Sequence, residues 1–167
     1  YITAQINERL GNHELALSDY QSIVNMNWKV KRKFWINSKI NSLRLSHDIN
    51  QTPFIEPVSE LLNVYENKLF SHRINRALAL HYLEQNIDSL AQKYLSISLN
   101  SEGIDQTTRE KNYRDLIDIN LKNQKYVRTG MYLDSLISVL PYESIKQKKA
   151  LRERESLSDI LFYENQF

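Results

Sequence analysis

The sequence predicts an all-α protein built from antiparallel helical hairpins. Three observations support this prediction. The chain has 167 residues but only three glycines and three prolines, whereas β-rich domains need turn residues about every 8–12 positions. Apolar residues recur at helical spacing, as at Ala16, Tyr20 and Ile23. No segment alternates polar and apolar residues in the way that a half-buried strand requires.

Turn and breaker residues divide the N-terminal half into four predicted helices. Gly11 suits the turn of the first hairpin because glycine adopts the left-handed conformation that often ends a helix. Pro53 and Pro57 indicate the clearest break, since proline is tolerated at the start of a helix but not inside one. The predicted helices are 1–10, 13–25, 30–46 and 56–67, the last with Leu61, Leu62 and Tyr65 directed inward.

The C-terminal half contains five more predicted helices. Ser71 and Asp88 are expected to cap two of them, because their side-chain oxygens can accept hydrogen bonds from free amides of the first turn. Ala77 belongs to the buried face of the first of these helices, either with Leu80, His81 and Glu84 or with Leu78 and Tyr82. The predicted helices are 73–85, 86–99, 107–121, 125–140 and 144–165, the last with Ala150, Leu157, Ile160 and Leu161 buried.

Small residues recur at matched positions and indicate a repeated hairpin. Ala16 and Ala91 each follow another alanine by twelve residues, at Ala4 and Ala79, and Thr129 takes the small position of a third unit. Bulky residues stand four positions later, at Tyr20, Leu95 and Leu133. This pattern resembles the tetratricopeptide repeat, in which small residues let paired helices approach while bulky ones separate neighbouring hairpins.

Ala91 and Thr129 are 38 residues apart, more than the usual period of about 34. We therefore predict one domain of divergent repeats stacked as an α-solenoid, and expect the chain to be a fragment of a longer protein. The alternative is a helical bundle in which the alanines match by accident. The predicted units are 1–28, 30–67, 71–100 and 107–140, followed by a closing helix at 144–165.

The sequence of these units resembles that of the tetratricopeptide-repeat lipoproteins of the type IX secretion and gliding-motility system of Bacteroidota, the SprE/PorW group. The segments that carry the resemblance are Tyr1–Ile6 with Gly11 and Ala16, Leu90–Leu95, Ser98–Ser101, Tyr126, Tyr132–Leu136 and Leu157–Tyr163. The resemblance implies a periplasmic, outer-membrane-anchored parent protein. It also implies that the parent contacts other components of the secretion machinery.

The repeat register predicts a partner-binding groove. Four basic residues take matching places in two successive units, in what we expect to be the first turns of their helices. Arginine can bind a carboxylate through two parallel hydrogen bonds, so an acidic or C-terminal peptide is the expected ligand. The alternative is that these side chains are solvated helix ends. The predicted site consists of Arg73, Arg76, Leu80, Lys111, Arg114 and Asp118.

A second basic cluster, Lys29–Lys33, lies beside Trp28, Phe34 and Trp35. It could bind phosphate or anionic headgroups. The balanced net charge of +2 favours the other interpretation, in which the lysines are solvated and the aromatic rings are in the core.

No motif in the sequence indicates catalysis. The four histidines lack metal-ligand spacing, cysteine is absent, and there is no glycine-rich phosphate loop. We therefore expect no cofactor, no metal, no nucleic acid and no membrane insertion. The favoured hypothesis is a non-catalytic protein-binding scaffold of a secretion or motility assembly. The alternatives are the peptide-sensing repeat domain of a transcriptional regulator and an enzyme built on a helical array.

Overall fold

The computed structural model describes the backbone of residues 1–164 and the side chains of residues 1–160. This part of the chain forms nine α-helices and contains no strand, which confirms the predicted all-α class. The helices are α1 (Ile2–Arg9), α2 (His13–Asn25), α3 (Arg32–Asn50), α4 (Ile55–Glu60), α5 (Ser71–Glu84), α6 (Asp88–Leu99), α7 (Gln106–Lys122), α8 (Tyr126–Val139) and α9 (Ile145–Glu164).

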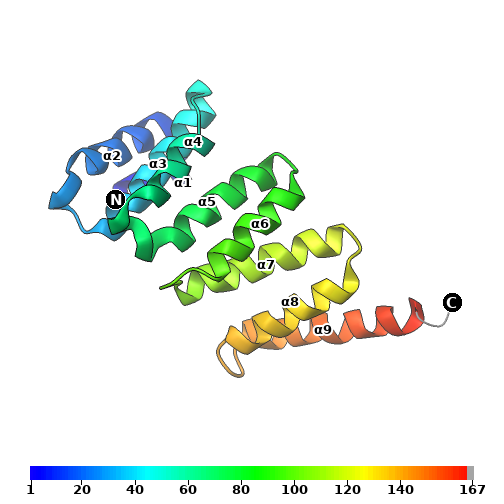
Figure 1. Cartoon of the computed structure of the whole chain (residues 1–167). Helices are drawn as coiled ribbons and strands as arrows, with labels where there is room; N and C mark the ends of the chain where they lie inside the picture. Colours follow the sequence, from blue (N-terminus) through cyan, green and yellow to red (C-terminus); the bar gives the residue numbers. More distant parts are fainter. Residues whose placement is uncertain (165–167) are drawn as a thin grey trace.

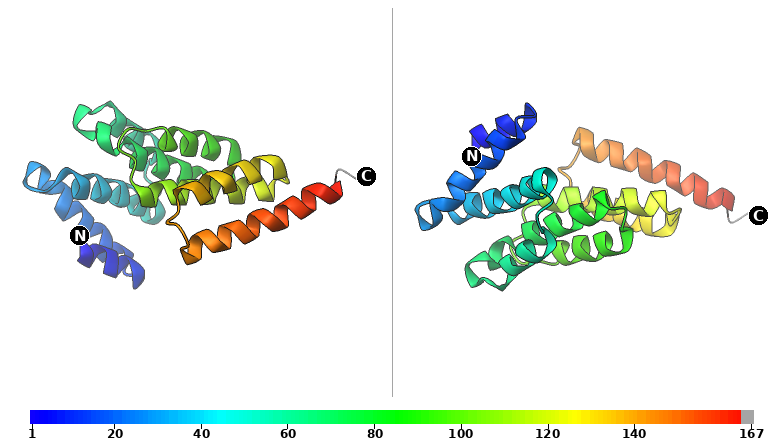
Figure 2. Two further views of the ribbon diagram at one scale, coloured as in Figure 1. Left: turned by 90° about the horizontal axis from the view of Figure 1, so that it is seen from below. Right: turned by 90° about the horizontal axis from the view of Figure 1, so that it is seen from above.

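The helices form antiparallel pairs that follow one another across the molecule (Figure 1). The turns inside the pairs α5/α6 and α7/α8 lie along one edge, and the connections between successive pairs lie along the opposite edge. Helix α9 packs against α8 at the C-terminal end of the row, on the side away from α5 and α6 (Figure 2).

The small residues predicted to bring paired helices together are completely buried. Ala4, Ala16, Ala79 and Ala91 have no exposed surface, and Thr129 is almost as buried. The bulky residues one turn later, Tyr20, Leu95 and Leu133, are also in the core. A methyl side chain at each alanine position lets the two backbones approach, so close packing at these points aligns each hairpin.

Three hairpins share the same turn geometry. Gly11, Asn86 and Gln124 each adopt a positive φ immediately after the first helix of a pair. In each turn the amide of that residue donates to the carbonyl three residues earlier at 3.0 Å, and the next amide donates to the carbonyl five residues earlier at 2.8–2.9 Å. This is the hydrogen-bond pattern of a Schellman motif. The turns therefore repeat in the same register as the buried alanines.

The prediction of one helix over 56–67 is wrong. Helix α4 ends at Glu60, and two short 3₁₀ helices follow, over Leu61–Asn63 and Tyr65–Phe70. Val64 between them has an extended backbone (φ −92°, ψ 119°), which interrupts the helical hydrogen bonds. Leu61 is buried as predicted, but Leu62 is partly exposed and Tyr65 points into solvent.

Three further local predictions are wrong. Ser71 and Asp88 do not cap helices; each is the first residue inside its helix, after Phe70 and Ile87. Ile160 is partly exposed, although Ala150 and Leu157 of the same helix are buried as predicted. The buried face of α5 contains Leu78 and His81, and Leu80 is partly exposed, so neither alternative for this face is entirely right. Leu161 and Asn165 lie outside the described side chains and backbone, respectively.

The close approach of α5 and α6 at Ala91 can be tested by enlarging that side chain. Replacing Ala91 with Leu should lower the free energy of unfolding by about 1–3 kcal/mol, because a leucine does not fit between the two helices without displacing them. Urea denaturation measures this change. Lys93→Leu, at an exposed position of the same helix, is the control and should change stability by less than about 0.5 kcal/mol. Equal effects of the two substitutions would contradict the packing interpretation.

Candidate functional site

Four of the six residues predicted to bind a partner line one groove. Arg73, Arg76 and Leu80 reach it from α5, and Lys111 reaches it from α7. This central groove has a volume of about 290 Å³ and is completed by Tyr1, Asn37, Ile40, Asn41, Ala77 and Thr108. The groove thus lies across α3, α5 and α7, which are the first helices of successive pairs.

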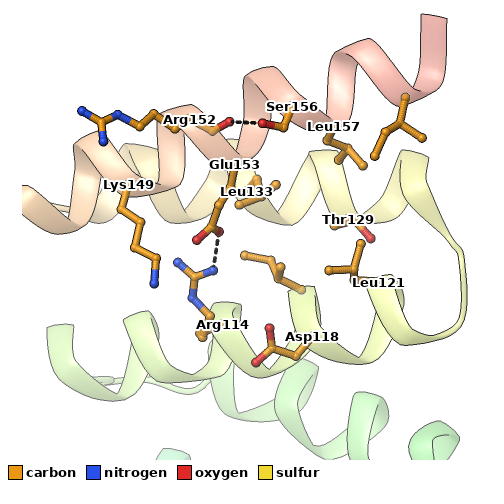
Figure 3. Close-up of a pocket in the computed structure, with 12 residues that line it drawn as sticks. Arg114, Asp118, Leu121, Thr129, Leu133, Lys149, Arg152, Glu153, Ser156 and Leu157 are labelled. Carbon is orange, nitrogen blue, oxygen red and sulfur yellow. Dashed lines mark hydrogen bonds and ion pairs between the residues drawn. The ribbon is translucent and has the colours of Figure 1, made fainter. Parts of the chain in front are cut away.

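The other two predicted residues line a different cavity. Arg114 and Asp118 belong to a cleft of about 470 Å³ between α7 and α9, with α8 as its floor (Figure 3). We call it the C-terminal cleft. Lys111 lies between the two sites, because it also lines a small pocket that it shares with Arg114. The structure therefore divides the predicted residues between two neighbouring sites.

The side chain of Arg73 is hydrogen-bonded to other residues of the protein. Its guanidinium donates to Asn37 Oδ1 of α3 at 3.1 Å and to Asp105 Oδ2 at 2.7 Å. Asp105 is the N-cap of α7, where its carboxylate also accepts from the Thr108 amide at 2.8 Å. His72 Nε2 lies 3.2 Å from the same carboxylate. Asp105 therefore connects the start of α7 to α5.

These contacts change the acidity of both groups. Burial alone would raise the pKa of Asp105, but donation from the amide and hydroxyl of Thr108, the charge of Arg73 and the His72 hydrogen bond lower it to about 2. Burial lowers the pKa of His72, and the neighbouring Asp105 only partly opposes this effect. Asp105 is accordingly ionised and His72 neutral near pH 7.

Arg76, also on α5, and Arg114 of α7 have similar polar partners on other helices. Arg76 donates to Asn112 and Asp115 of α7, both at 2.6 Å, and its side chain is only 16% exposed. Arg114 pairs with Glu153 of α9 at 2.6 Å, as Figure 3 shows. Arg76 therefore joins α5 to α7, the first helices of two successive pairs, and Arg114 joins α7 to α9.

These contacts form a repeated ladder. The partners are 32–39 residues apart in sequence, which is close to one repeat. Arg44 of α3 and Glu8 of α1 form an equivalent ion pair at a separation of 36 residues. Because the arginines bind within the protein, they are better described as links between hairpins than as free binding groups. Among the described side chains, Lys111 has no carboxylate within ion-pair distance.

Three of the four basic residues lie further from the start of their helix than predicted. Arg76, Lys111 and Arg114 were expected in first turns, but α5 begins at Ser71 and α7 begins at Gln106 with Asp105 as its cap. They therefore lie in the second and third turns, where the helix dipole has little effect on a cation.

The acidic and amide partners of the arginines were not predicted from the sequence. Asp105, Asp115 and Glu153 each follow an arginine by 32–39 residues. Opposite charges that recur at the repeat period are the signal that could have identified these pairs, because equivalent positions of adjacent hairpins lie side by side.

The basic–aromatic cluster is partly exposed. The Trp35 indole donates to Val24 O at 3.1 Å, and Arg32 stacks over its ring at 4.1 Å, so this aromatic packs inward as favoured. Trp28, by contrast, is 82% exposed and Phe34 is 40% exposed, so the favoured interpretation is wrong for these two rings. The reason is local: Asn27 has a positive φ and begins a 3₁₀ turn that directs Trp28 outward.

His47 and His81 both lie against the ring of Phe54. The His81 ring lies 4.8 Å from Phe54 and 5.1 Å from His47 between ring centroids. Burial lowers the pKa of His81, and His47 adds to this effect. Within the described residues there is no group of three or more histidine or acidic side chains placed to hold a metal ion, and no helix long and apolar enough to span a membrane.

The structural role of Arg76 can be measured directly. Arg76→Ala should lower the free energy of unfolding by about 1.5–3 kcal/mol, because it removes hydrogen bonds to a charged group and leaves Asp115 unpaired. Lys111→Ala, at an exposed position, should change it by less than about 0.5 kcal/mol. Chemical denaturation of both variants measures the difference. A loss for Lys111→Ala as large as that for Arg76→Ala would contradict the ladder.

The Asp105 cap should act only while the carboxylate is ionised. Asp105→Ala should cost about 0.5–2 kcal/mol of stability near pH 7. Because the pKa of Asp105 is lowered in the folded state to about 2, its stabilisation is complete above the unfolded pKa of about 3.9 and is lost as the pH falls towards 2. The difference between wild type and variant should therefore shrink from pH 5 to pH 2.

Thermal denaturation over this pH range tests the prediction. Glu102→Ala, which removes an exposed ion pair with Lys68, is the control and should have almost no effect at either pH. A pH-independent loss for Asp105→Ala would argue against the ionised cap.

Comparison with known proteins adds no family to this description: no protein-family model matches the chain, and no curated protein is significantly similar to it.

Proposed function

We propose that this chain is a non-catalytic scaffold that binds another protein through the face formed by α1, α3, α5 and α7. The observation that carries the proposal is the central groove. It combines the partly exposed side chain of Leu80 with the exposed Lys111, and the arginine contacts hold its walls together. A groove with rigid walls and accessible apolar and basic groups suits the binding of a peptide segment, because little ordering of the site is needed on binding.

The chemistry of the groove supports a protein ligand more than a reaction. Arg73 and Arg76 are occupied by asparagine and aspartate side chains. They hold the helices together and give the groove a fixed shape. Lys111 supplies an accessible positive charge, and Leu80 with Ile40 and Ala77 supplies apolar surface. A segment of mixed apolar and acidic character would be complementary to these groups.

The proposed setting of this scaffold comes from the resemblance of its repeats. On that basis we propose that the parent protein is a tetratricopeptide-like, outer-membrane-anchored lipoprotein in the periplasm. There it would contact components of a type IX secretion or gliding-motility assembly.

Affinity capture from the native cells, with the full chain as bait, tests the proposal. Leu80→Asp should abolish recovery of the bound protein, because the substitution places a charge in the apolar part of the groove. Ile97→Asp is the matched control: Ile97 is 41% exposed and Leu80 38%, but Ile97 lies on α6 outside the central groove. Recovery should be unchanged for Ile97→Asp.

Circular dichroism would establish that both variants fold. Equal recovery by the two folded variants would reject binding through this groove. No specific recovery with the unsubstituted bait would reject the scaffold role itself.

A further inference from the structure

Among the described side chains, two ion pairs join α7 and α9 beside the C-terminal cleft. Lys146 of α9 pairs with Glu110 of α7 at 2.9 Å, and Glu153 pairs with Arg114 at 2.6 Å. Thr129 and Leu133 of α8 lie at the bottom of the cleft and are almost completely buried (Figure 3). The accessible apolar surface of the cleft therefore comes from its walls.

One half of the cleft is apolar. Leu121 of α7 is 48% exposed and Ile160 of α9 is 44% exposed, and both line it. Other apolar lining residues are Ile117, Leu133 and Leu157. Two large aliphatic side chains held half-exposed on facing walls can cover an apolar group that enters between them.

The other end of the cleft meets a basic pocket. This pocket has a volume of about 260 Å³ and shares Arg114 and Lys149 with the cleft. Its lining consists of four basic residues, one acidic residue and two leucines: Lys111, Arg114, Lys146, Lys149, Glu110, Leu136 and Leu140. Glu110 is already paired with Lys146. Among the described side chains, neither Lys111 nor Lys149 has a carboxylate within ion-pair distance.

We propose that the C-terminal cleft binds a peptide segment that carries a carboxylate next to large apolar side chains. The carboxylate lies in the basic pocket near Lys111 and Lys149, and the apolar side chains lie between Leu121 and Ile160. This inference rests on the proposed protein-binding function and adds to it a second site beside the central groove, with which it shares Lys111, and a ligand of defined chemistry.

Charge distribution argues for this ligand over the alternatives. A basic segment would meet four cations in the adjoining pocket and be repelled. A purely apolar segment would leave the lysines of that pocket partly desolvated without a partner, which is unfavourable. In the apolar half, Asp118 is the one acidic lining residue besides Glu153, which is paired with Arg114. Its charge therefore opposes an incoming carboxylate there and favours the basic end.

Peptide binding to the full 167-residue chain tests this inference. The probe is a fluorescein-labelled peptide in which pairs of glutamates alternate with pairs of leucines. The comparison peptide has lysine in place of each glutamate. Fluorescence anisotropy should show that the glutamate peptide binds and the lysine peptide does not, and that binding weakens as salt is raised.

Two pairs of substitutions locate the binding. Lys149→Glu should weaken binding about tenfold, whereas Lys148→Glu, at an exposed position on the same helix that does not line the cleft, should leave it unchanged. Ile160→Ser should weaken it by a similar factor, whereas Ile145→Ser, which is exposed outside the cleft, should not.

The possible results are distinct. Equal binding of both peptides, or equal effects within each pair of variants, would overturn the assignment of the cleft. Unchanged binding of the glutamate peptide to the Lys149→Glu variant would also overturn this assignment. If the glutamate peptide fails to bind while Leu80→Asp still abolishes partner capture, the proposed function stands and only this second site is rejected. Circular dichroism of each variant excludes unfolding as the cause of a loss.

Discussion

The close approach of paired helices at alanine determines much of this structure. At Ala4, Ala16, Ala79 and Ala91 no side-chain surface remains exposed. A larger residue there would separate the two helices of a pair. Once they approach, the larger side chains one turn later, such as Tyr20 and Leu95, can fill the space beside them. Each hairpin is therefore a unit of defined shape, and the Schellman turns hold its two helices in a constant register.

Polar contacts then join one hairpin to the next. Arg73, Arg76 and Arg114 each reach a partner that lies about one repeat later in the chain. Isolated exposed ion pairs contribute little stability, but partly buried and charge-assisted contacts contribute more and are specific in geometry. The same contacts shape the central groove, because they hold α3, α5 and α7 beside one another. The C-terminal cleft lies beside the Arg114–Glu153 pair, between α7 and α9.

This arrangement explains why the predicted binding residues have two roles. The sequence register placed six residues on one face. Four of them, Arg73, Arg76, Leu80 and Lys111, line one groove, whereas Arg114 and Asp118 line the C-terminal cleft. The arginines, however, are engaged by Asp105, Asp115 and Asn residues of neighbouring helices. The accessible groups of the groove are consequently Leu80 and Lys111. A ligand would contact a surface whose shape depends on the arginines rather than form its main ion pairs with them.

The sequence by itself determined the helical class, the division into pairs and the positions of the buried small residues. These properties depend on local information: helical spacing of apolar residues, scarce glycine and proline, and turn residues such as Gly11. Only the tertiary structure decided where each side chain found its partner. Tyr65 is exposed because Val64 interrupts the helix, and Arg114 is paired because Glu153 arrives from α9. Such contacts depend on how successive hairpins are placed, and helical periodicity carries no information about that placement.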